Sequence, residues 1–248
     1  MSHRKLVIVP TYNELENISD MVQTVMELEG NFELLIIDDG SPDGTAGIVK
    51  SMQNAFEGRL HLMERAGKLG LGTAYIAGFR WALERDYDFI FEMDCDFSHD
   101  PKDLIRLYQG IKNRDYDLAI GSRYITGVNV VNWPMGRVLM SYFASKYVNF
   151  ITGLPIQDAT AGFKCYHRSV LEGIALDKIK FIGYAFQIEM KFTAWKLGFK
   201  LVEVPIIFTD RTRGQSKMSP KIFKEAVLGV ILMKLKSIFK PYRLVKSN

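Results

Sequence analysis

The sequence predicts an α/β fold built around one mostly parallel sheet. The chain has 248 residues, of which 48% are hydrophobic, so it can bury a substantial core. Along the first half, short apolar runs alternate with stretches whose apolar residues recur at helical spacing. Such alternation is typical of βαβ units, in which the strands are parallel and the helices cover the sheet. No internal repeat or linker divides the chain into independent domains.

In the first half, five strands and four helices are expected in turn. The strands are predicted at residues 5–9, 33–37, 59–63, 88–93 and 117–120, and the helices at 14–29, 43–56, 72–85 and 101–113. Asn13 followed by Glu16 predicts a capping box at the start of the first helix. The stretch "DDGSPDGT" combines a strand end, a Pro-Gly turn and a helix start.

The second half is less regular. Helices are predicted at residues 132–152 and 184–197, and strands at 160–168 and 200–208. Pro205 indicates that the last strand lies at an edge of the sheet, because proline cannot donate a ladder hydrogen bond. Ser219 as an N-cap and Pro220 at the first helical position predict one more helix.

Polar clusters directly follow four of the predicted strands. These clusters are "PTYNE", "DDGSPDGT", "DCD" and "GSRY". In an open parallel sheet the carboxyl ends of the strands meet at one edge, where ligands bind. We therefore expect the four clusters to form a single site.

The "DCD" cluster places Asp94 and Asp96 on either side of Cys95, so in extended chain the two carboxylates share a face. Such a pair is favourable when a divalent cation lies between them, and Mg²⁺ or Mn²⁺ typically takes one or two carboxylates together with substrate phosphates. The ordinary structural alternative is a strand end whose acids face water, with Asp100 or His99 capping the next helix. A third metal ligand is left open between Ser98, His99 and water.

Several other classes of site fit the sequence poorly. The glycine-rich "GKLGLGTAYIAGF" lacks both the dinucleotide pattern and a G-K-[ST] phosphate loop, so Lys68 is as consistent with a solvated loop as with a phosphate contact. A phosphatase-type aspartate pair would follow the first strand, not the fourth. Two cysteines are too few for a disulfide framework, and the N-terminal apolar run is too short for a signal peptide. These features favour a reducing, cytoplasmic compartment.

The charge is distributed unevenly along the chain. Residues 211–248 hold ten Lys and Arg against one acid, although the whole chain carries only +4. The apolar stretch 221–239 contains no uncharged run longer than the eight residues 226–233, whereas about 18 are needed to span a bilayer. An apolar helix rimmed by lysines suits the surface of an anionic membrane better than nucleic acid. Packing of this helix on the protein's own core or on a partner subunit is the alternative.

Taken in order, the motifs resemble those of family 2 glycosyltransferases of GT-A fold, and within them the dolichol-phosphate (polyprenol-phosphate) mannose synthases. The motifs are "VPTYNELENI", "IIDDGSPDGTA", "KLGLGTAYIAGF", "FEMDCDFSHDP", "IGSRY", "NWPMGR", "TAGFKCYHR", "GYAFQIEM" and "TDRTRGQSKMS". The resemblance covers roughly residues 5–220. It implies a GT-A catalytic domain at residues 1–218, followed by a basic amphipathic helix and tail at 219–248.

The resemblance implies transfer of mannose from GDP-mannose to a polyprenyl phosphate with inversion, dependent on Mg²⁺ or Mn²⁺. The enzyme would be peripheral on the cytoplasmic face of a membrane, without nucleic acid and with room for an integral-membrane partner subunit. Three alternatives stay open: another donor such as UDP-glucose, a polysaccharide acceptor, and a non-catalytic subunit that binds a nucleotide sugar. A hydroxyl acceptor would require a general base, for which Glu189 is the candidate, although a carboxylate paired with a nearby lysine is its ordinary role.

The resemblance also implies roles for individual residues, which fall into three groups. Nucleotide-sugar contacts are expected from Pro10, Tyr12, Glu14, Ile37, Asp39, Asp94, Cys95, Asp96, Arg123, Arg211 and Lys217. The acceptor phosphate is expected at Arg123, Arg137 and Ser141, the metal at Asp94 and Asp96, and the catalytic contribution from Asp96, Arg123 and Arg211. The chain departs from the family pattern in two ways: Cys95 replaces the usual alanine, and no membrane-spanning helix is expected after the catalytic domain.

Overall fold

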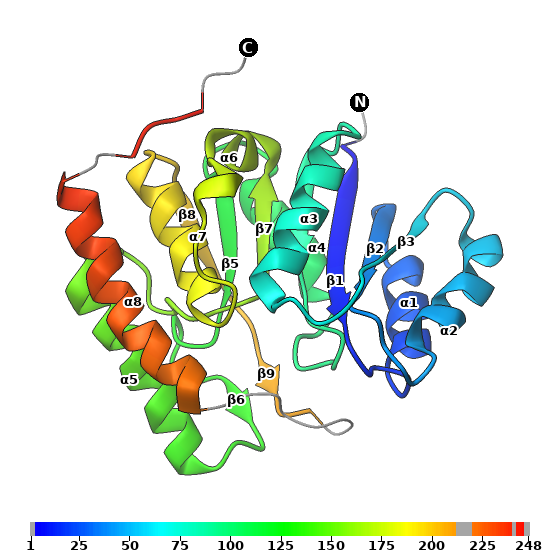
Figure 1. Ribbon diagram of the computed structural model, residues 1–248, viewed down its shortest axis with the longest axis horizontal. Helices are drawn as coiled ribbons and strands as arrows, with labels where there is room; N and C mark the ends of the chain where they lie inside the picture. The colour runs from blue at the N-terminus through cyan, green and yellow to red at the C-terminus, as the bar shows by residue number, and fades with distance from the viewer. Residues whose placement is uncertain (1–2, 212–219, 240–241, 246–248) are drawn as a thin grey trace.

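The computed structural model describes residues 3–211, 220–239 and 242–245, with the backbone alone for residues 220–226. Within these residues, seven strands form a central sheet in the order β3-β2-β1-β4-β7-β5-β8 (Figure 1). The strands are β1 (Lys5–Thr11), β2 (Phe32–Asp38), β3 (Leu60–Glu64), β4 (Phe89–Glu92), β5 (Leu118–Ser122), β7 (Lys164–His167) and β8 (Leu201–Pro205). Two short strands, β6 (Val130–Val131) and β9 (Phe208–Thr209), pair separately.

Every strand pair in the central sheet is parallel except the two pairs made by β7. The expected α/β class with a mostly parallel sheet is therefore confirmed. As Pro205 indicated, β8 is an edge strand. β7 runs antiparallel to both β4 and β5, and this reversal was not predicted from the sequence.

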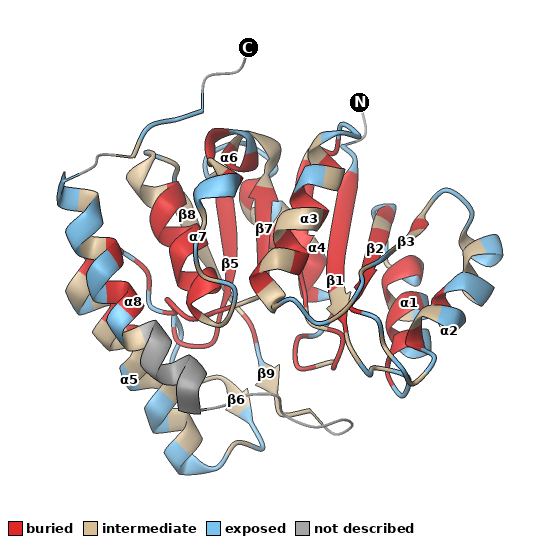
Figure 2. Cartoon of the chain, viewed as in Figure 1, coloured by how far each residue is buried: buried red, intermediate tan, exposed pale blue. Residues whose placement is uncertain are grey.

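Helices cover both faces of the sheet, and buried residues follow this arrangement (Figure 2). The helices are α1 (Ile18–Glu27), α2 (Thr45–Met52), α3 (Leu71–Leu83), α4 (Asp103–Ile111), α5 (Met135–Thr152), α6 (Arg168–Gly173), α7 (Ala185–Lys196) and α8 (Pro220–Phe239), with short 3₁₀ turns at Gln53–Phe56 and Leu176–Lys178. Along β1, Leu6 and Ile8 join the core beneath α3 and α7, whereas Val7 and Val9 join the core beneath α1 and α4. This alternation is the two-residue period of a strand buried on both faces.

The first helix begins later than the sequence predicts. α1 starts at Ile18, its N-cap is Asn17, and that side chain makes no capping hydrogen bond. The predicted capping box at Asn13 and Glu16 is therefore wrong. Asn13 has a positive φ of 55°, and its backbone N–H donates to Ser41 Oγ at 3.0 Å. Residues 12–16 instead form a loop above the carboxyl end of β1.

α8 lies along α5 at one end of the sheet, and one of its faces is packed (Figure 1). Val230 and Met233 are buried, and Gly229 lies so close to the Phe181 ring that an added Cβ would be 2.6 Å from it. The Tyr147 hydroxyl donates to the carbonyl of Val227 at 2.9 Å. Packing on the protein's own core is thus correct for this face, whereas the opposite face leaves Leu228, Leu232, Leu235, Ile238 and Phe239 exposed.

Across the part of the chain that the structure describes, none of the helices combines the length and the hydropathy that crossing a membrane requires.

Candidate functional site

A cavity of about 800 Å³ opens at the carboxyl edge of the sheet, where the polar clusters were expected to meet. Its volume is within the usual range for ligand sites. One end is lined by polar residues from the loops after β1, β2 and β4, including Tyr12, Asp39 and Asp96. The other end passes between α5, α7 and α8 and is lined by apolar side chains such as Phe143, Val148 and Val230. The cavity therefore joins a polar end to an apolar end.

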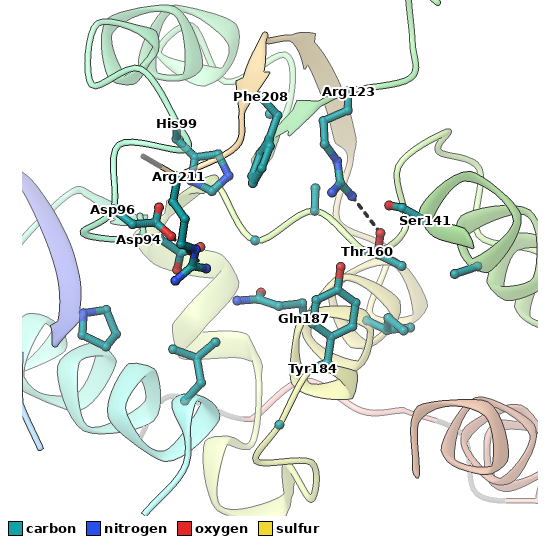
Figure 3. A pocket seen from close by; sticks show the side chains of 18 of the residues that line it. Asp94, Asp96, His99, Arg123, Ser141, Thr160, Tyr184, Gln187, Phe208 and Arg211 are labelled. Carbon is teal, nitrogen blue, oxygen red and sulfur yellow. Dashed lines mark hydrogen bonds and ion pairs between the residues drawn. The ribbon is translucent and has the colours of Figure 1, made fainter. Parts of the chain in front are cut away.

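The two aspartates after β4 lie together at the polar end (Figure 3). Asp96 Oδ1 accepts the backbone N–H of Ser98 at 3.0 Å, and Asp96 Oδ2 lies 2.9 Å from Arg211 Nη2. Loss of solvent and the neighbouring Asp96 carboxylate raise the pKa of Asp94 to about 7. Two carboxylates this close are a poor arrangement without a cation, so Arg211 provides their counter-charge in the protein alone.

The donor set fits a hard divalent cation that is completed by its substrate. No cluster of three or more His, Cys, Asp or Glu side chains suited to a metal occurs among the described residues. Mg²⁺ and Mn²⁺ sites commonly use only one or two carboxylates together with phosphate oxygens and water. Asp94 and Asp96 meet this requirement, and the buried Cys95 between them is small enough to leave the carboxylates accessible.

Around the aspartates, the loops after β1 and β2 complete the polar end. Pro10, Tyr12 and Glu14 line the cavity, and Lys68 Nζ lies 5.0 Å from the centre of the Tyr12 ring. Asp39 is held by two contacts from Arg65, Nε to Oδ1 at 2.6 Å and Nη2 to Oδ2 at 2.8 Å. Arg65 was not anticipated from the sequence, because it lies 26 residues away from its partner.

Ile37 does not reach this cavity. Its side chain is fully buried, and its Cδ1 atom would lie 2.9 Å from a Cβ added at Gly78 in α3. The expectation that Ile37 lies beside the base and ribose is therefore wrong for its side chain. The apolar alternation of β2 directs residue 37 into the core beneath α3.

Three residues expected at the acceptor phosphate line the middle of the cavity: Arg123, Arg137 and Ser141. Arg137 Nη1 lies 2.8 Å from Asp210 Oδ1, and its guanidinium lies 4.2 Å from the centre of the Trp133 ring. Ser141 Oγ accepts the Tyr124 hydroxyl at 2.8 Å. Arg123 pairs with Asp158, its side chain is only 6% exposed, and it lines the cavity.

Beneath the cavity lies a buried charged network that was not predicted from the sequence. Lys164 Nζ is 3.0 Å from Glu92 Oε2, and both side chains have no exposed surface. The Tyr166 hydroxyl and the Gln187 amide donate to the two oxygens of Glu92 at 2.7 and 2.8 Å, and Gln187 reaches the cavity (Figure 3). Charged residues inside the apolar stretches "FIFEM" and "AGFKCY" were the available signal. Two such residues on facing strands imply a buried pair.

The remaining predicted residues are placed as follows. His99 lines the cavity, stacks on Phe163 with ring centres 4.9 Å apart, and is neutral because burial lowers its pKa to about 4. Ser98 is buried and contributes its backbone N–H to Asp96.

Glu189 accepts the backbone N–H groups of Lys180 and Phe181 at 2.8 and 3.0 Å and does not line the cavity, so the structure brings no general base there from α7. Lys217 lies outside the described residues.

Comparison with known proteins identifies the family. The family model for glycosyl transferase family 2 matches residues 6–175, which is more than half of the chain.

The chain belongs to glycosyltransferase family 2.

This family 2 glycosyltransferase has relatives whose similarity extends over most of its length. It is 46% identical over 229 residues to polyprenol monophosphomannose synthase of Mycolicibacterium smegmatis, covering 92% of this chain and 86% of that protein. It is 44% identical over 227 residues to undecaprenyl-phosphate mannosyltransferase of Micrococcus luteus, covering 92% of both chains.

Solved structures share its fold at lower identity. Glucosyl-3-phosphoglycerate synthase from Mycobacterium tuberculosis, in complex with Mn²⁺, UDP and glucosyl-3-phosphoglycerate, aligns with a TM-score of 0.65 at 18% identity, covering 95% of this glycosyltransferase and 79% of that chain. A mannosyltransferase from Pyrobaculum calidifontis, in complex with GDP-Man and Mn²⁺, aligns with a TM-score of 0.57 at 16% identity, covering 94% and 70%. These likenesses confirm the expected GT-A fold.

Proposed function

We propose that this glycosyltransferase transfers mannose from GDP-mannose to a polyprenyl phosphate, with inversion at the anomeric carbon. Two relatives above 40% identity carry the names of polyprenol-phosphate mannosyltransferases. The observation that carries the proposal is the make-up of the cavity: a carboxylate pair at one end, arginines in the middle and an apolar passage at the other end. A sugar nucleotide, a phosphate and a lipid chain require these three environments in this order.

At the polar end, Asp94 and Asp96 would hold Mg²⁺ or Mn²⁺ against the donor diphosphate, and Asp39, Tyr12, Glu14 and Pro10 would surround the nucleoside. The bound cation would supply counter-charge for the departing diphosphate. Arg211 now pairs with Asp96, so it lies close enough to turn toward the same phosphates. Lys217 is proposed for the same role on the resemblance alone. Cleavage at an anomeric carbon develops charge on the leaving group, and cations fixed there stabilise the transition state.

In the middle of the cavity, Arg123, Arg137 and Ser141 would bind the acceptor phosphate. A phosphate is already an anion at neutral pH and can attack without a general base, provided that it is held in line. The placement of Glu189 outside the cavity and the low pKa of His99 both agree with a reaction that needs no base. A hydroxyl acceptor would require a base that the acceptor end of the cavity does not offer among its described lining residues.

We further propose that α5 and α8 rest on the cytoplasmic face of a membrane. The apolar end of the cavity opens between these helices, where a polyprenyl chain would leave the enzyme. Large apolar side chains are exposed on these two helices: Met135, Leu139, Phe143, Leu232 and Phe239. Lys234, Lys236 and Arg243 add positive charge nearby. On this proposal the tail at 219–248 serves the catalytic domain as a membrane contact, and an integral-membrane subunit would dock there.

A panel assay tests the proposed function. The full chain is incubated with radiolabelled GDP-mannose, UDP-glucose and UDP-GlcNAc, each with a short-chain polyprenyl phosphate or the matching polyprenol, with Mn²⁺ or with EDTA. We expect labelled lipid from GDP-mannose and the phosphate in the presence of Mn²⁺. The polyprenol is the matched control, since it has the same chain without the anionic nucleophile. Labelling of the polyprenol at a comparable rate, or faster transfer from a UDP-sugar, would contradict the proposal.

A further inference from the structure

Arg123 is the most constrained residue of the proposed acceptor site, and it is constrained by groups that lie outside the cavity. Resting on the proposed function, we propose that Asp158 and Glu203 are positioning residues that fix the Arg123 guanidinium for the acceptor phosphate. Neither residue lines the cavity, whereas Arg123 does. The two carboxylates would thus act on the acceptor indirectly, through Arg123 and through Thr160, whose hydroxyl contacts Asp158 and which also lines the cavity.

The first step of this chain is the contact between Arg123 and Asp158. Asp158 Oδ2 accepts Arg123 Nε at 2.7 Å and the Arg123 backbone N–H at 3.0 Å. Asp158 Oδ1 accepts Arg123 Nη2 at 2.7 Å, and Thr160 Oγ1 accepts the second Nη2 hydrogen at 2.8 Å. These bonds use Nε and Nη2, so the two hydrogens of Nη1 are the ones left to meet a ligand. Because a guanidinium is planar, fixing two of its nitrogens also fixes the orientation of the third nitrogen.

Aromatic rings restrict the same guanidinium from its other sides. Its carbon lies 5.2 Å from the centre of the Tyr124 ring, 5.6 Å from Phe208 and 5.7 Å from Trp133. Tyr124 also donates to Ser141, and Trp133 also faces Arg137, so the rings connect the proposed acceptor residues to one another. Rotation of Arg123 away from Asp158 would displace Tyr124 and Trp133, the side chains that contact Ser141 and Arg137.

The second step is the contact between Glu203 and the loop that carries Asp158. Glu203 lies on the edge strand β8, opposite Ile120 of β5. Ile120 precedes Arg123 by three residues. Its carboxylate accepts the backbone N–H of Gln157 at 2.6 Å and that of Asp158 at 2.8 Å. Loop 153–163 joins α5 to β7, and these two bonds fix the height of Asp158 above β5. Glu203 is only partly buried, so it can be changed with less risk to the core than Asp158.

Arg123 and Asp158 form an ionised pair. Burial disfavours the Asp158 carboxylate, but the Arg123 charge and its hydrogen bonds outweigh burial, so the pKa of Asp158 lies below its ordinary value. A buried ion pair of this kind also occurs for purely structural reasons, and breaking it destabilises a protein. Loss of stability therefore cannot distinguish positioning from structure. A change confined to acceptor binding can distinguish a positioning role from a purely structural one.

The experiment measures KM for the polyprenyl phosphate, KM for GDP-mannose and kcat in the full-length protein. Glu203→Gln is expected to raise the acceptor KM about threefold to tenfold, and Asp158→Asn about tenfold or more, because a binding group that is displaced by a fraction of an ångström loses its alignment with the substrate and Asp158 contacts Arg123 directly. The donor KM should rise less than the acceptor KM, because Arg123 is also expected at the donor phosphates, whereas the other residues of the polar end do not depend on this chain of contacts. Calorimetry with GDP and Mn²⁺ provides a second measure of donor binding.

Asp117→Asn is the matched control. Its carboxylate accepts the backbone N–H of Lys200 at 2.9 Å, at the opposite end of the same β5–β8 pair. Glu203→Gln with the kinetics of Asp117→Asn, or an equal rise in both KM values, would overturn the inference and leave the proposed function intact. If Asp158→Asn does not fold, the KM values of Glu203→Gln alone test the inference. Failure of the wild-type enzyme to use polyprenyl phosphate would overturn the proposed function, and the inference with it.

Discussion

Individual residues of the cavity are organised as pairs of opposite charge, two at the proposed donor end and two at the proposed acceptor phosphate. Arg65 holds Asp39, Arg211 holds Asp96, Arg123 is held by Asp158, and Arg137 by Asp210. Where the carboxylate faces the cavity, as at Asp39 and Asp96, a cation or a ribose would bind to that carboxylate. Where the arginine faces the cavity, as at Arg123 and Arg137, a phosphate would bind to that arginine. These pairs keep the partly buried charges compensated until substrates replace one partner.

Asp96 is the residue whose loss should affect catalysis most. Asp96→Asn keeps the shape of the side chain but removes charge from the proposed cation site, so we expect transfer to fall by about 100-fold or more. Initial rates at saturating Mn²⁺ measure the effect. Asp100→Asn is the control, because Asp100 lies in the same loop, is exposed, and its carboxylate accepts only the Lys102 N–H among the contacts described. A rate for Asp96→Asn within about tenfold of that control would exclude Asp96 as a cation ligand.

If Asp96 holds the cation as proposed, Arg211 would compete with the cation for Asp96, so its removal should separate binding from catalysis. In Arg211→Gln, the affinity of the nucleotide-free protein for Mn²⁺ should rise, by up to about fivefold for an ion pair worth about 1 kcal/mol. Transfer should nevertheless fall by about tenfold or more, because the diphosphate loses a cation in the transition state. Mn²⁺ titration followed by electron paramagnetic resonance checks the first effect. Arg106→Gln, which breaks the pair between the exposed Arg106 and the buried Asp103, is the control, and weaker Mn²⁺ binding by Arg211→Gln would contradict the competition.

At the level of elements, two helices carry out tasks that their amphipathic patterns alone do not reveal. α3 approaches β1 and β2 through a glycine and brings the Leu71 end of the helix to the cavity. α8 packs one face on the core and leaves another apolar face outside. In both cases the packing of the element decides which of its residues are available for function.

Gly78 sets the distance between α3 and the sheet. An added Cβ would lie 2.8 Å from Ile8 Cδ1 and 2.9 Å from Ile8 Cγ2, which the backbone of β1 fixes in place. We expect Gly78→Ala to lower the free energy of unfolding by about 1–3 kcal/mol. Gly47→Ala on α2 is the matched control: it has open space around it and should gain up to about 1 kcal/mol from helix propensity. Chemical denaturation measures both, and equal stabilities would contradict the close packing of α3.

The outer face of α8 can be tested without disturbing its inner face. Leu232 is 65% exposed, whereas deletion of the whole helix would uncover Val230 and Met233. Leu232→Glu should weaken sedimentation with anionic vesicles by about tenfold or more, because it removes an apolar contact worth about 1.5–3 kcal/mol and adds negative charge that the anionic vesicles repel. Tyr116→Glu is the control, since Tyr116 is also exposed and lies near the amino end of β5, away from the cavity edge of the sheet. Unchanged vesicle binding by Leu232→Glu would remove α8 from the membrane contact.

At the level of the whole molecule, the two ends of the cavity come from the two halves of the chain. The loops after β1, β2 and β4 supply the polar end, and α5, α7 and α8 supply the apolar end. Ligands that occupy the polar end should therefore stabilise the fold as a unit, because the central sheet connects both ends.

Thermal unfolding checks this coupling. GDP with Mn²⁺, each at about 100 times its dissociation constant, should add about 2.7 kcal/mol and raise Tm by about 5–10 °C. GDP with EDTA should give a much smaller shift, because Asp94 and Asp96 would then repel the diphosphate. Asp96→Asn should likewise lose most of the increase. A full shift in EDTA would show that the nucleotide binds without a cation.

The sequence by itself determined the fold class, the edge position of β8 and the polar clusters that line the cavity. These features depend on local pattern: apolar periodicity separates strands from helices, Pro205 restricts a strand to an edge, and parallel strands bring the residues that follow them to one edge. Asp94, Asp96 and Arg123 follow such strands directly, and Arg137 and Arg211 lie in motifs that resemble those of the family. All five residues line the cavity as expected.

Only the tertiary structure decided which side chains reach the cavity and what holds them. Ile37 turned into the core because its face of β2 lies beneath α3, and Glu189 was taken up by the backbone N–H groups of Lys180 and Phe181. The partners Arg65, Asp158 and Glu203 lie 26 to 80 residues from Asp39 and Arg123 in sequence, a separation at which no periodicity relates two positions. Ion pairs depend on distance in space, and that distance is set only when the sheet has assembled.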